Sequence, residues 1–200
     1  MSTLTNIFDT ETTGIPEYKL PSEDPCQPHL VELAANLYDD TGLLVESFSA
    51  IIKPDGWEIP EAVIAIHGIT MEMAMDVGIP EKEAVEAFMA LHAKAGLRVA
   101  HNCSFDDRII RIALKRYLGD EAADLFKAGP NFCTALKSKS VLMLPATEAM
   151  TKKSNFKVKT PTLAEAYEFF TGQKLEESHR AKADAEACAR VYFAMQKVAA

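Results

Sequence analysis

Cysteine is scarce in this 200-residue chain, and no two cysteines form a CxxC pair. The four that occur are Cys26, Cys103, Cys133 and Cys188, which are far apart and lie in or beside apolar segments. A structural zinc site or a disulfide framework needs closely spaced or paired cysteines, so the sequence argues against both. We expect reduced, buried thiols.

Long apolar segments are also missing. A membrane-spanning helix needs about 18 consecutive apolar residues, and no apolar run in this chain approaches that length. Charged residues make up 25% of the chain. The first residues, MSTLTNIFDTE, contain neither the basic segment nor the apolar core of a secretory signal. We therefore expect no membrane association and a cytoplasmic location. With 48% hydrophobic residues and ten prolines spread along the chain, residues 1–200 fit a single domain.

Positive charge is in deficit, because 21 basic residues stand against 29 acidic ones and the net charge is −8. A protein that binds nucleic acid through a broad basic surface is normally rich in Lys and Arg, so this class is disfavoured. The objection weakens if some carboxylates hold divalent cations, since the ions then supply the charge that meets a phosphate. Composition alone does not decide between these two interpretations.

The hydrophobic pattern predicts strands at the start of the chain and helices after them. The expected strands are 4–8, two extended runs between Leu30 and Pro54 joined by a turn at 39–42, 97–102 and a brief strand at 132–133. The expected helices are 61–66, 81–95, 104–118, 134–144, 162–170 and 181–198, with a lysine-bearing loop at 145–161. Such an order favours a mixed sheet with helices packed on it.

Two acidic residues follow the first expected strand. Asp9 and Glu11 are two residues apart at the end of an apolar run, so their side chains point to the same face of a strand. Neighbouring like charges need a positive partner, although a solvated turn is the commoner explanation for such a pair taken alone.

A second acidic pair opens the helix expected after residue 103. Ser104 and Asp107 have the spacing of a capping box, which gives Asp107 a structural role. Asp106 then remains, and by itself it could do no more than favour the positive end of the helix dipole.

The last helix carries an acid on its apolar face. One stripe of this helix, with steps of four and three residues, is formed by Asp184, Cys188, Val191, Met195 and Val198. A carboxylate directed toward a core costs several kcal/mol unless it is paired or bound to a metal. The alternative is that Asp184 lies in an exposed first turn.

His179 stands five residues before Asp184. Inside one helix the two would lie on different sides, since each residue turns about 100°, so they converge only if His179 precedes the helix. Glu176, Glu177 and Ser178 favour a flexible loop there. A histidine of near-neutral pKa can take a proton from water, whereas a lone surface histidine usually has no role.

Taken together, FDTETTG, HNCSFD and HRAKAD resemble the three motifs of the DEDDh (DnaQ-like) 3′→5′ exonucleases, the superfamily of the proofreading subunit of bacterial replicative DNA polymerase. The resemblance spans nearly the whole chain, and IHGIT at 66–70 and TLAEAYEFFTGQK add to it. By this resemblance the metal ligands are Asp9, Glu11, Asp106 and Asp184, and His179 is the general base. Asp107 is the departure from the pattern, since it could replace Asp106 as the ligand.

The resemblance implies a single exonuclease domain over 1–200 with a ribonuclease H-like fold, a five-stranded mixed sheet flanked by helices. It also implies two Mg²⁺ or Mn²⁺ ions, ~4 Å apart, that stabilise the attacking and leaving oxygens of an in-line displacement. Four carboxylates without a cysteine or histidine cage suit such hard cations. The products would be nucleoside 5′-monophosphates.

The expected partner is the 3′ end of DNA, with a polymerase or other replication protein as a second partner. Residues expected to contact the substrate are Thr12, Thr13, Ile66, His67, Asn102 and Phe105, of which Phe105 could equally belong to the core, and the backbone N–H groups of the two threonines are the proposed donors. The lysine-rich segment 152–159 could follow the incoming strand, although a solvated loop is the commoner explanation.

Three alternatives remain at this stage. One is an exoribonuclease of the same superfamily acting on RNA 3′ ends or short oligoribonucleotides, distinguished by recognition of the 2′-hydroxyl. Another is a noncatalytic nucleic-acid-binding module, in which at least one acid is normally substituted. The third is an acidic structural domain with no dependence on divalent metal.

Overall fold

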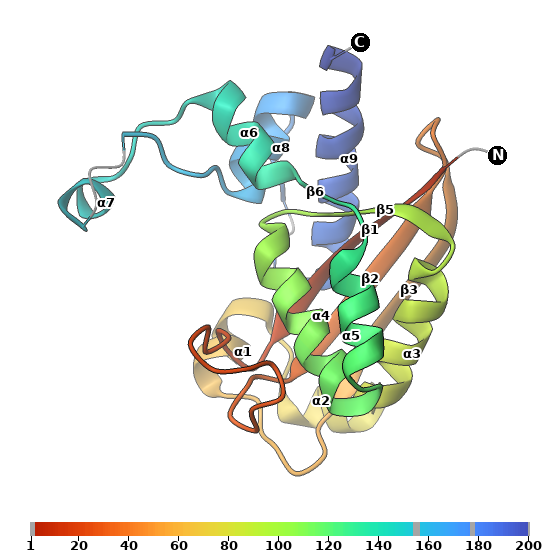
Figure 1. Ribbon diagram of the computed structural model, residues 1–200. Helices are drawn as coiled ribbons and strands as arrows, with labels where there is room; N and C mark the ends of the chain where they lie inside the picture. Colours follow the sequence, from red (N-terminus) through yellow and green to blue (C-terminus); the bar gives the residue numbers. More distant parts are fainter. Residues whose placement is uncertain (1–2, 154–156, 177–178, 200) are drawn as a thin grey trace.

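A mixed six-stranded sheet forms the centre of the computed structural model, which describes residues 3–153, 157–176 and 179–199 (Figure 1). The strands are β1 (Leu4–Thr12), β2 (Leu30–Tyr38), β3 (Leu44–Lys53), β4 (Ile79–Pro80), β5 (Ala95–Ala100) and β6 (Asn131–Cys133). Their order is β4-β3-β2-β1-β5-β6. Strand β1 is central, antiparallel to β2 and parallel to β5. The expected mixed sheet is confirmed, and the two-residue strand β4 makes it six-stranded rather than five-stranded.

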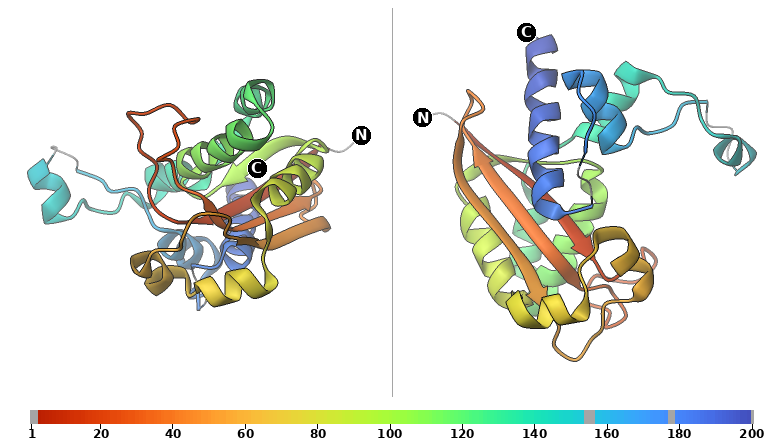
Figure 2. Two further views of the ribbon diagram at one scale, coloured as in Figure 1. Left: turned by 90° about the horizontal axis from the view of Figure 1, so that it is seen from below. Right: turned by 180° about the vertical axis from the view of Figure 1, so that it is seen from behind.

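Helices cover both faces of this sheet. They are α1 (Glu61–His67), α2 (Met71–Val77), α3 (Glu81–His92), α4 (Cys103–Tyr117), α5 (Asp120–Ala128), α6 (Thr134–Leu142), α7 (Glu148–Lys153), α8 (Leu163–Thr171) and α9 (Ala181–Ala199). Helices α3, α4 and α5 lie on one face, and α9 crosses the other with α8 beside it (Figure 2). Among the described residues, none of the helices combines the length and the apolar character needed to cross a bilayer.

The alternation of β1 divides its side chains between two cores. Phe8 packs against Phe88 at a ring-centroid distance of 5.3 Å and against Phe126 at 6.4 Å, on the side of α3 and α5. Ile7 belongs to the opposite cluster, with Cys188 of α9. Successive residues of a strand point to opposite faces, so residues 7, 9 and 11 all face α9.

The beginning of α4 differs from the sequence expectation. The helix starts at Cys103, after Asn102 in the left-handed conformation at φ 68°, and no side chain caps it. The capping box predicted for Ser104 and Asp107 is wrong, because Ser104 already lies inside the helix. Asp107 instead binds Arg98 through two hydrogen bonds of 2.9 and 2.8 Å.

Three short helices, α2, α5 and α7, were not expected from the sequence, and α7 lies inside the predicted loop at 145–161. All four cysteines are free, as expected. Cys103 and Cys188 are buried and Cys133 is half-buried, but Cys26 is exposed, contrary to the prediction of burial. Its proline-rich loop leaves that side chain on the surface.

Candidate active site

The carboxyl half of β1 places two acids beneath α9. Asp9 pairs with Ala34 of β2 and Glu11 pairs with Glu32, and a register shift follows directly between Glu11 and Thr12. Both side chains face the start of α9, where small residues pack the helix closely on the sheet: Ala34, Ala181 and Ala185 form one buried cluster. A close helix can therefore bring a third acid to the pair.

That third acid is Asp184, in the first turn of α9. Carboxylate oxygens of Asp9, Glu11 and Asp184 lie within 4.8 Å of one another, although the three residues come from two distant parts of the chain. Asp184 is 8% exposed and its Oδ1 is buried without a hydrogen-bond partner. The expectation that Asp184 shares the apolar face of its helix is confirmed for Cys188 and Val191, which are buried. The side chain of Val198 lies outside the described residues.

Asp106 approaches the same acids from α4. It is 2% exposed, and its Oδ1 accepts a 2.8 Å hydrogen bond from the Thr10 hydroxyl. Among the neighbouring acids whose charges raise the pKa of Asp9, Asp106 has the largest effect. Asp107 points elsewhere, to Arg98, whose guanidinium also donates to the Gly129 carbonyl and lies 4.5 Å from the Phe126 ring centroid. The choice between the two aspartates therefore favours Asp106.

Burial and mutual repulsion make these carboxyls hard to ionise without a cation. Burial, followed by the charges of Asp106, Asp184 and Glu11, raises the pKa of Asp9 well above its ordinary value. Burial and the Asp184 charge raise the pKa of Glu11 to about 7. Burial also raises the pKa of Asp106, to about 8, and that of Asp184. A divalent ion would remove this repulsion.

This electrostatic strain predicts how the metal-free protein responds to pH. Between about pH 4 and pH 8, the folded state retains protons on Glu11 and Asp106 that the unfolded chain has released. Stability therefore falls as pH rises through this window. We expect the Tm in EDTA to fall by at least roughly 2–4 °C from pH 5 to pH 8, and Mg²⁺ or Mn²⁺ to restore it at pH 8. Calorimetry measures both effects.

The matched control for this experiment is Asp106→Asn, which keeps the shape of the side chain and removes its charge. Its metal-free Tm should fall less over the same window than that of the wild type. The electrostatic account would be contradicted by a wild-type Tm that rose from pH 5 to pH 8, or by one that neither Mg²⁺ nor Mn²⁺ raised at pH 8.

His179 precedes α9, as the sequence argument required. Its backbone has φ 64°, in the left-handed region, and its N–H donates to Asp184 Oδ2 at 2.8 Å. The imidazole is exposed, so it is accessible to water beside the acids. Of the three residues on which we based a flexible loop, Glu176 lies outside any helix or strand, and Glu177 and Ser178 lie outside the described residues.

The residues of the IHGIT segment lie at the end of α1. Gly68, at φ 72°, ends the helix and turns the chain, which leaves Ile66 55% exposed and His67 4% exposed. His67 Nδ1 accepts the Ile69 N–H at 3.1 Å, so the proton of the neutral ring is on Nε2. That N–H is buried without a partner, and burial lowers the pKa of His67. A donor of this kind can be satisfied by a ligand.

The other residues expected to contact the substrate differ in their burial and hydrogen bonding. Thr12 is buried and its hydroxyl donates to the Gly14 carbonyl at 2.7 Å. The Thr13 N–H donates to the His29 carbonyl at 3.0 Å, so this bond occupies the amide that we expected to hold a 3′ end. Asn102 lies immediately before α4, and Phe105 is half-buried against the core, as its alternative assignment anticipated.

Two polar residues beside the acids were missed by the sequence analysis. Glu32 of β2 is 3% exposed and binds Arg180, the residue after His179. Glu32 lies in an apolar run of β2, and only its register opposite Glu11 could have indicated a role.

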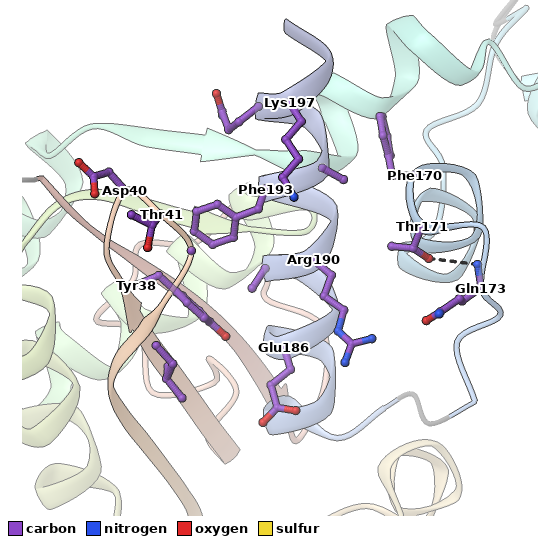
Figure 3. Close-up of a pocket in the computed structure, with 15 residues that line it drawn as sticks. Tyr38, Asp40, Thr41, Phe170, Thr171, Gln173, Glu186, Arg190, Phe193 and Lys197 are labelled. Carbon is purple, nitrogen blue, oxygen red and sulfur yellow. Dashed lines mark hydrogen bonds between the residues drawn. The ribbon is translucent and has the colours of Figure 1, made fainter. Parts of the chain in front are cut away.

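A large hollow lies elsewhere, between the β2–β3 turn and α8 and α9 (Figure 3). Its volume is about 990 Å³, and its lining includes Tyr38, Phe193, Glu186 and Arg190. Glu186 is two residues and Arg190 six residues beyond Asp184, which at about 100° per residue places both on a different face of α9 from Asp184. None of the clustered acids lines it, so the candidate chemistry is not in this hollow.

Comparison with known proteins supports one family. The family model described as RNase_T, exonuclease, matches residues 7–192. The DNA polymerase III epsilon subunit of Buchnera aphidicola is 33% identical over 102 residues, which cover 51% of this chain and 40% of that protein. A PolC-type DNA polymerase III of Lacticaseibacillus paracasei is 29% identical over 196 residues, 97% of this chain and 11% of the polymerase.

Solved structures agree with the fold. Escherichia coli exonuclease I in complex with a dA16 oligonucleotide matches with a TM-score of 0.74 at 18% identity, covering 98% of this chain and 41% of that one. The chain thus spans less than half of each of these three proteins. The chain and exonuclease I share the ribonuclease H-like architecture.

Proposed function

The chain belongs to the RNase_T exonuclease family, in the DnaQ-like DEDDh superfamily, and from this premise we propose that it hydrolyses DNA from the 3′ end. Each cycle would release one nucleoside 5′-monophosphate from a single-stranded or frayed end. The observation that carries the proposal is the meeting of Asp9, Glu11 and Asp184 oxygens within 4.8 Å, with Asp106 buried beside them.

The donor set fits divalent metal. The four acids offer oxygen atoms alone, and Asp184 Oδ1 is buried without a partner, as expected of an atom that awaits a cation. We propose that Asp9, Glu11, Asp106 and Asp184 hold two ions, Mg²⁺ or Mn²⁺, since these cations prefer oxygen ligands. When bound, the ions would polarise the phosphate and stabilise the charge on the attacking and leaving oxygens.

The side chains of this protein then have separate roles in the hydrolysis. His179 takes a proton from water at an imidazole nitrogen while the water oxygen bonds to phosphorus. The bond from phosphorus to the O3′ of the preceding nucleotide breaks, and that oxygen takes a proton from solvent. The exposure of the His179 side chain and the hydrogen bond from its backbone N–H to the Asp184 carboxylate support this role.

Binding of the last nucleoside is assigned to residues around the acids. The unpartnered Nε2–H of His67 would donate to a sugar or base oxygen, and the exposed Ile66 would pack on the base. Thr12, Asn102 and Phe105 stand at the ends of β1 and β5 and the start of α4, close in sequence to the acids. The relatives named above are a subunit of DNA polymerase III and a PolC-type DNA polymerase III, so a polymerase or another replication protein is the partner we propose.

A time course with end-labelled oligonucleotides tests the proposal. Single-stranded DNA and RNA of one sequence, labelled at the 5′ or the 3′ end, are incubated with Mg²⁺, with Mn²⁺ and with EDTA. We expect 5′-labelled DNA to shorten in single-nucleotide steps with either metal, and 3′-labelled DNA to release labelled mononucleotide at once. EDTA should stop both reactions.

The comparison of polymers decides the substrate. Faster degradation of DNA supports the proposal, whereas faster degradation of RNA would replace it with the exoribonuclease alternative. If metal-loaded, folded protein cleaved neither polymer, the noncatalytic binding module would be the better account.

A further inference from the structure

A fifth carboxylate lies beside the four proposed ligands. Glu32 stands opposite Glu11 in the β1–β2 register and is 3% exposed. Its charge raises the pKa values of Asp9, Glu11 and Asp184. A buried carboxylate in such company is costly unless it is paired and hydrogen-bonded, so its bonds indicate what it does.

Both oxygens of Glu32 are engaged by the segment that leads into α9. Arg180 donates from one guanidinium nitrogen to Oε1 at 2.8 Å and from Nε to Oε2 at 3.1 Å. The Ala181 N–H donates to Oε2 at 2.8 Å. Ala181 is the first residue of α9 and is fully buried, so Glu32 also satisfies a free amide at the helix N-terminus.

These bonds fix the residues between the proposed base and the proposed ligand. Asp184 accepts the His179 N–H at 2.8 Å, and its own N–H donates to the Arg180 carbonyl at 2.9 Å. Residues 179, 180 and 181 are therefore tied to Asp184 on one side and to Glu32 on the other. Because β2 pairs directly with β1, this arrangement sets the first turn of α9 relative to Asp9 and Glu11.

Glu32 does not belong to the ligand cluster itself. The oxygens that come within 4.8 Å of one another are those of Asp9, Glu11 and Asp184, and both Glu32 oxygens already accept N–H groups. We infer that Glu32 is a positioning residue, which with Arg180 holds His179 and Asp184 against the acids of β1. The inference rests on the proposed function, because it names what aligns that same site.

The first test is Glu32→Gln, which keeps the size of the side chain and removes its charge. A shift of about 1 Å in a reacting group can cost roughly 100-fold in rate, so we expect kcat to fall at least about tenfold while KM for DNA stays within about threefold. The matched control is Glu81→Gln. Glu81 is 4% exposed, binds Arg116 at 3.1 Å and accepts the Leu30 N–H at 3.0 Å.

Glu81, like Glu32, is a buried carboxylate that binds an arginine and a backbone N–H. Its charge is not among those that shift the pKa values of the clustered acids. The Glu81→Gln control should lose thermal stability and keep kcat within about twofold of wild type. If Glu81→Gln lowered kcat as much as Glu32→Gln did, the effect of Glu32 would be general loss of stability, and the inference would fail.

A second test uses Arg180→Met, at a half-exposed side chain whose loss should leave the protein folded. Alone it leaves the Glu32 charge uncompensated among the acids, so kcat should fall at least as far as in Glu32→Gln. The double variant Glu32→Gln/Arg180→Met should be no slower than Arg180→Met, since the unpaired charge is gone. If the kcat reductions of the two single variants multiplied in the double variant, Glu32 and Arg180 would act independently, and the inference would be overturned.

Readouts without substrate separate this inference from the proposed function. In Glu32→Gln, hydrogen exchange at the Ala181 and Asp184 amides should accelerate at least about tenfold, whereas in Glu81→Gln it should not change. The double variant removes one negative and one positive charge, so its net charge equals that of the wild type. Any loss of Mn²⁺ affinity in it therefore reflects a change in the geometry of the site.

Inactive wild-type protein would refute the proposed function and leave these readouts valid. Active wild-type protein with unchanged hydrogen exchange in Glu32→Gln would refute the positioning role alone.

Discussion

Asp9→Ala should abolish hydrolysis, with kcat at least ~10³-fold below wild type, while the protein still folds. Asp9 lies on the central strand between the other acids, and Asp106, Asp184 and Glu11 all raise its pKa. Its removal takes away a metal ligand and also relieves repulsion in the metal-free site. The initial rate on end-labelled DNA measures the first effect, and the Tm in EDTA measures the second.

The same result is expected for Asp106→Ala and Asp184→Ala. Asp106→Ala also leaves the Thr10 hydroxyl without its acceptor, so its Tm should lie below that of Asp9→Ala. Asp76→Ala, at an exposed acid of α2, is the matched control and should hydrolyse DNA at the wild-type rate. Wild-type turnover in any one of the three site variants would remove that residue from the assignment.

His179→Ala should lower kcat by ~10²–10⁴, the range for loss of a general base, and leave Mn²⁺ affinity nearly unchanged. The structure gives a reason for this separation. His179 contacts Asp184 through its backbone N–H rather than its imidazole, so the 2.8 Å bond survives the substitution. Single-turnover kinetics measures the rate, and Mn²⁺ titration followed by electron paramagnetic resonance measures the affinity.

A collapse of Mn²⁺ affinity in His179→Ala would instead make the imidazole a metal ligand. An unchanged rate with unchanged affinity would remove His179 from the mechanism, and the proton would then need another acceptor.

The acids could be found from the sequence because their local signals are strong. Asp9 and Glu11 follow an apolar strand at a spacing of two, and Asp184 occupies the apolar stripe of a long helix. Each signal is ambiguous alone, and their common order along the chain made the resemblance specific. The three carboxylates meet because α9 crosses β1. This packing belongs to the tertiary structure and leaves no local signal in the sequence.

Other features left little local signal. The Ser104 and Asp107 spacing was read as a cap, but the long-range pair of Asp107 with Arg98 decides the role of Asp107. Glu32 lies in a fully buried strand, where periodicity predicts an apolar residue. Its partner Arg180 is 148 residues away in sequence, and no spacing rule connects two such positions.

The central claim is that Asp9, Glu11, Asp106 and Asp184 together hold the divalent ions that the hydrolysis requires. Anomalous diffraction from crystals grown with Mn²⁺ and a nucleoside 5′-monophosphate tests it most directly. We predict two anomalous peaks in contact with carboxylate oxygens of these residues, and neither peak in Asp9→Ala. Manganese bound away from the four acids, or no manganese at all in well-ordered wild-type crystals, would contradict the account.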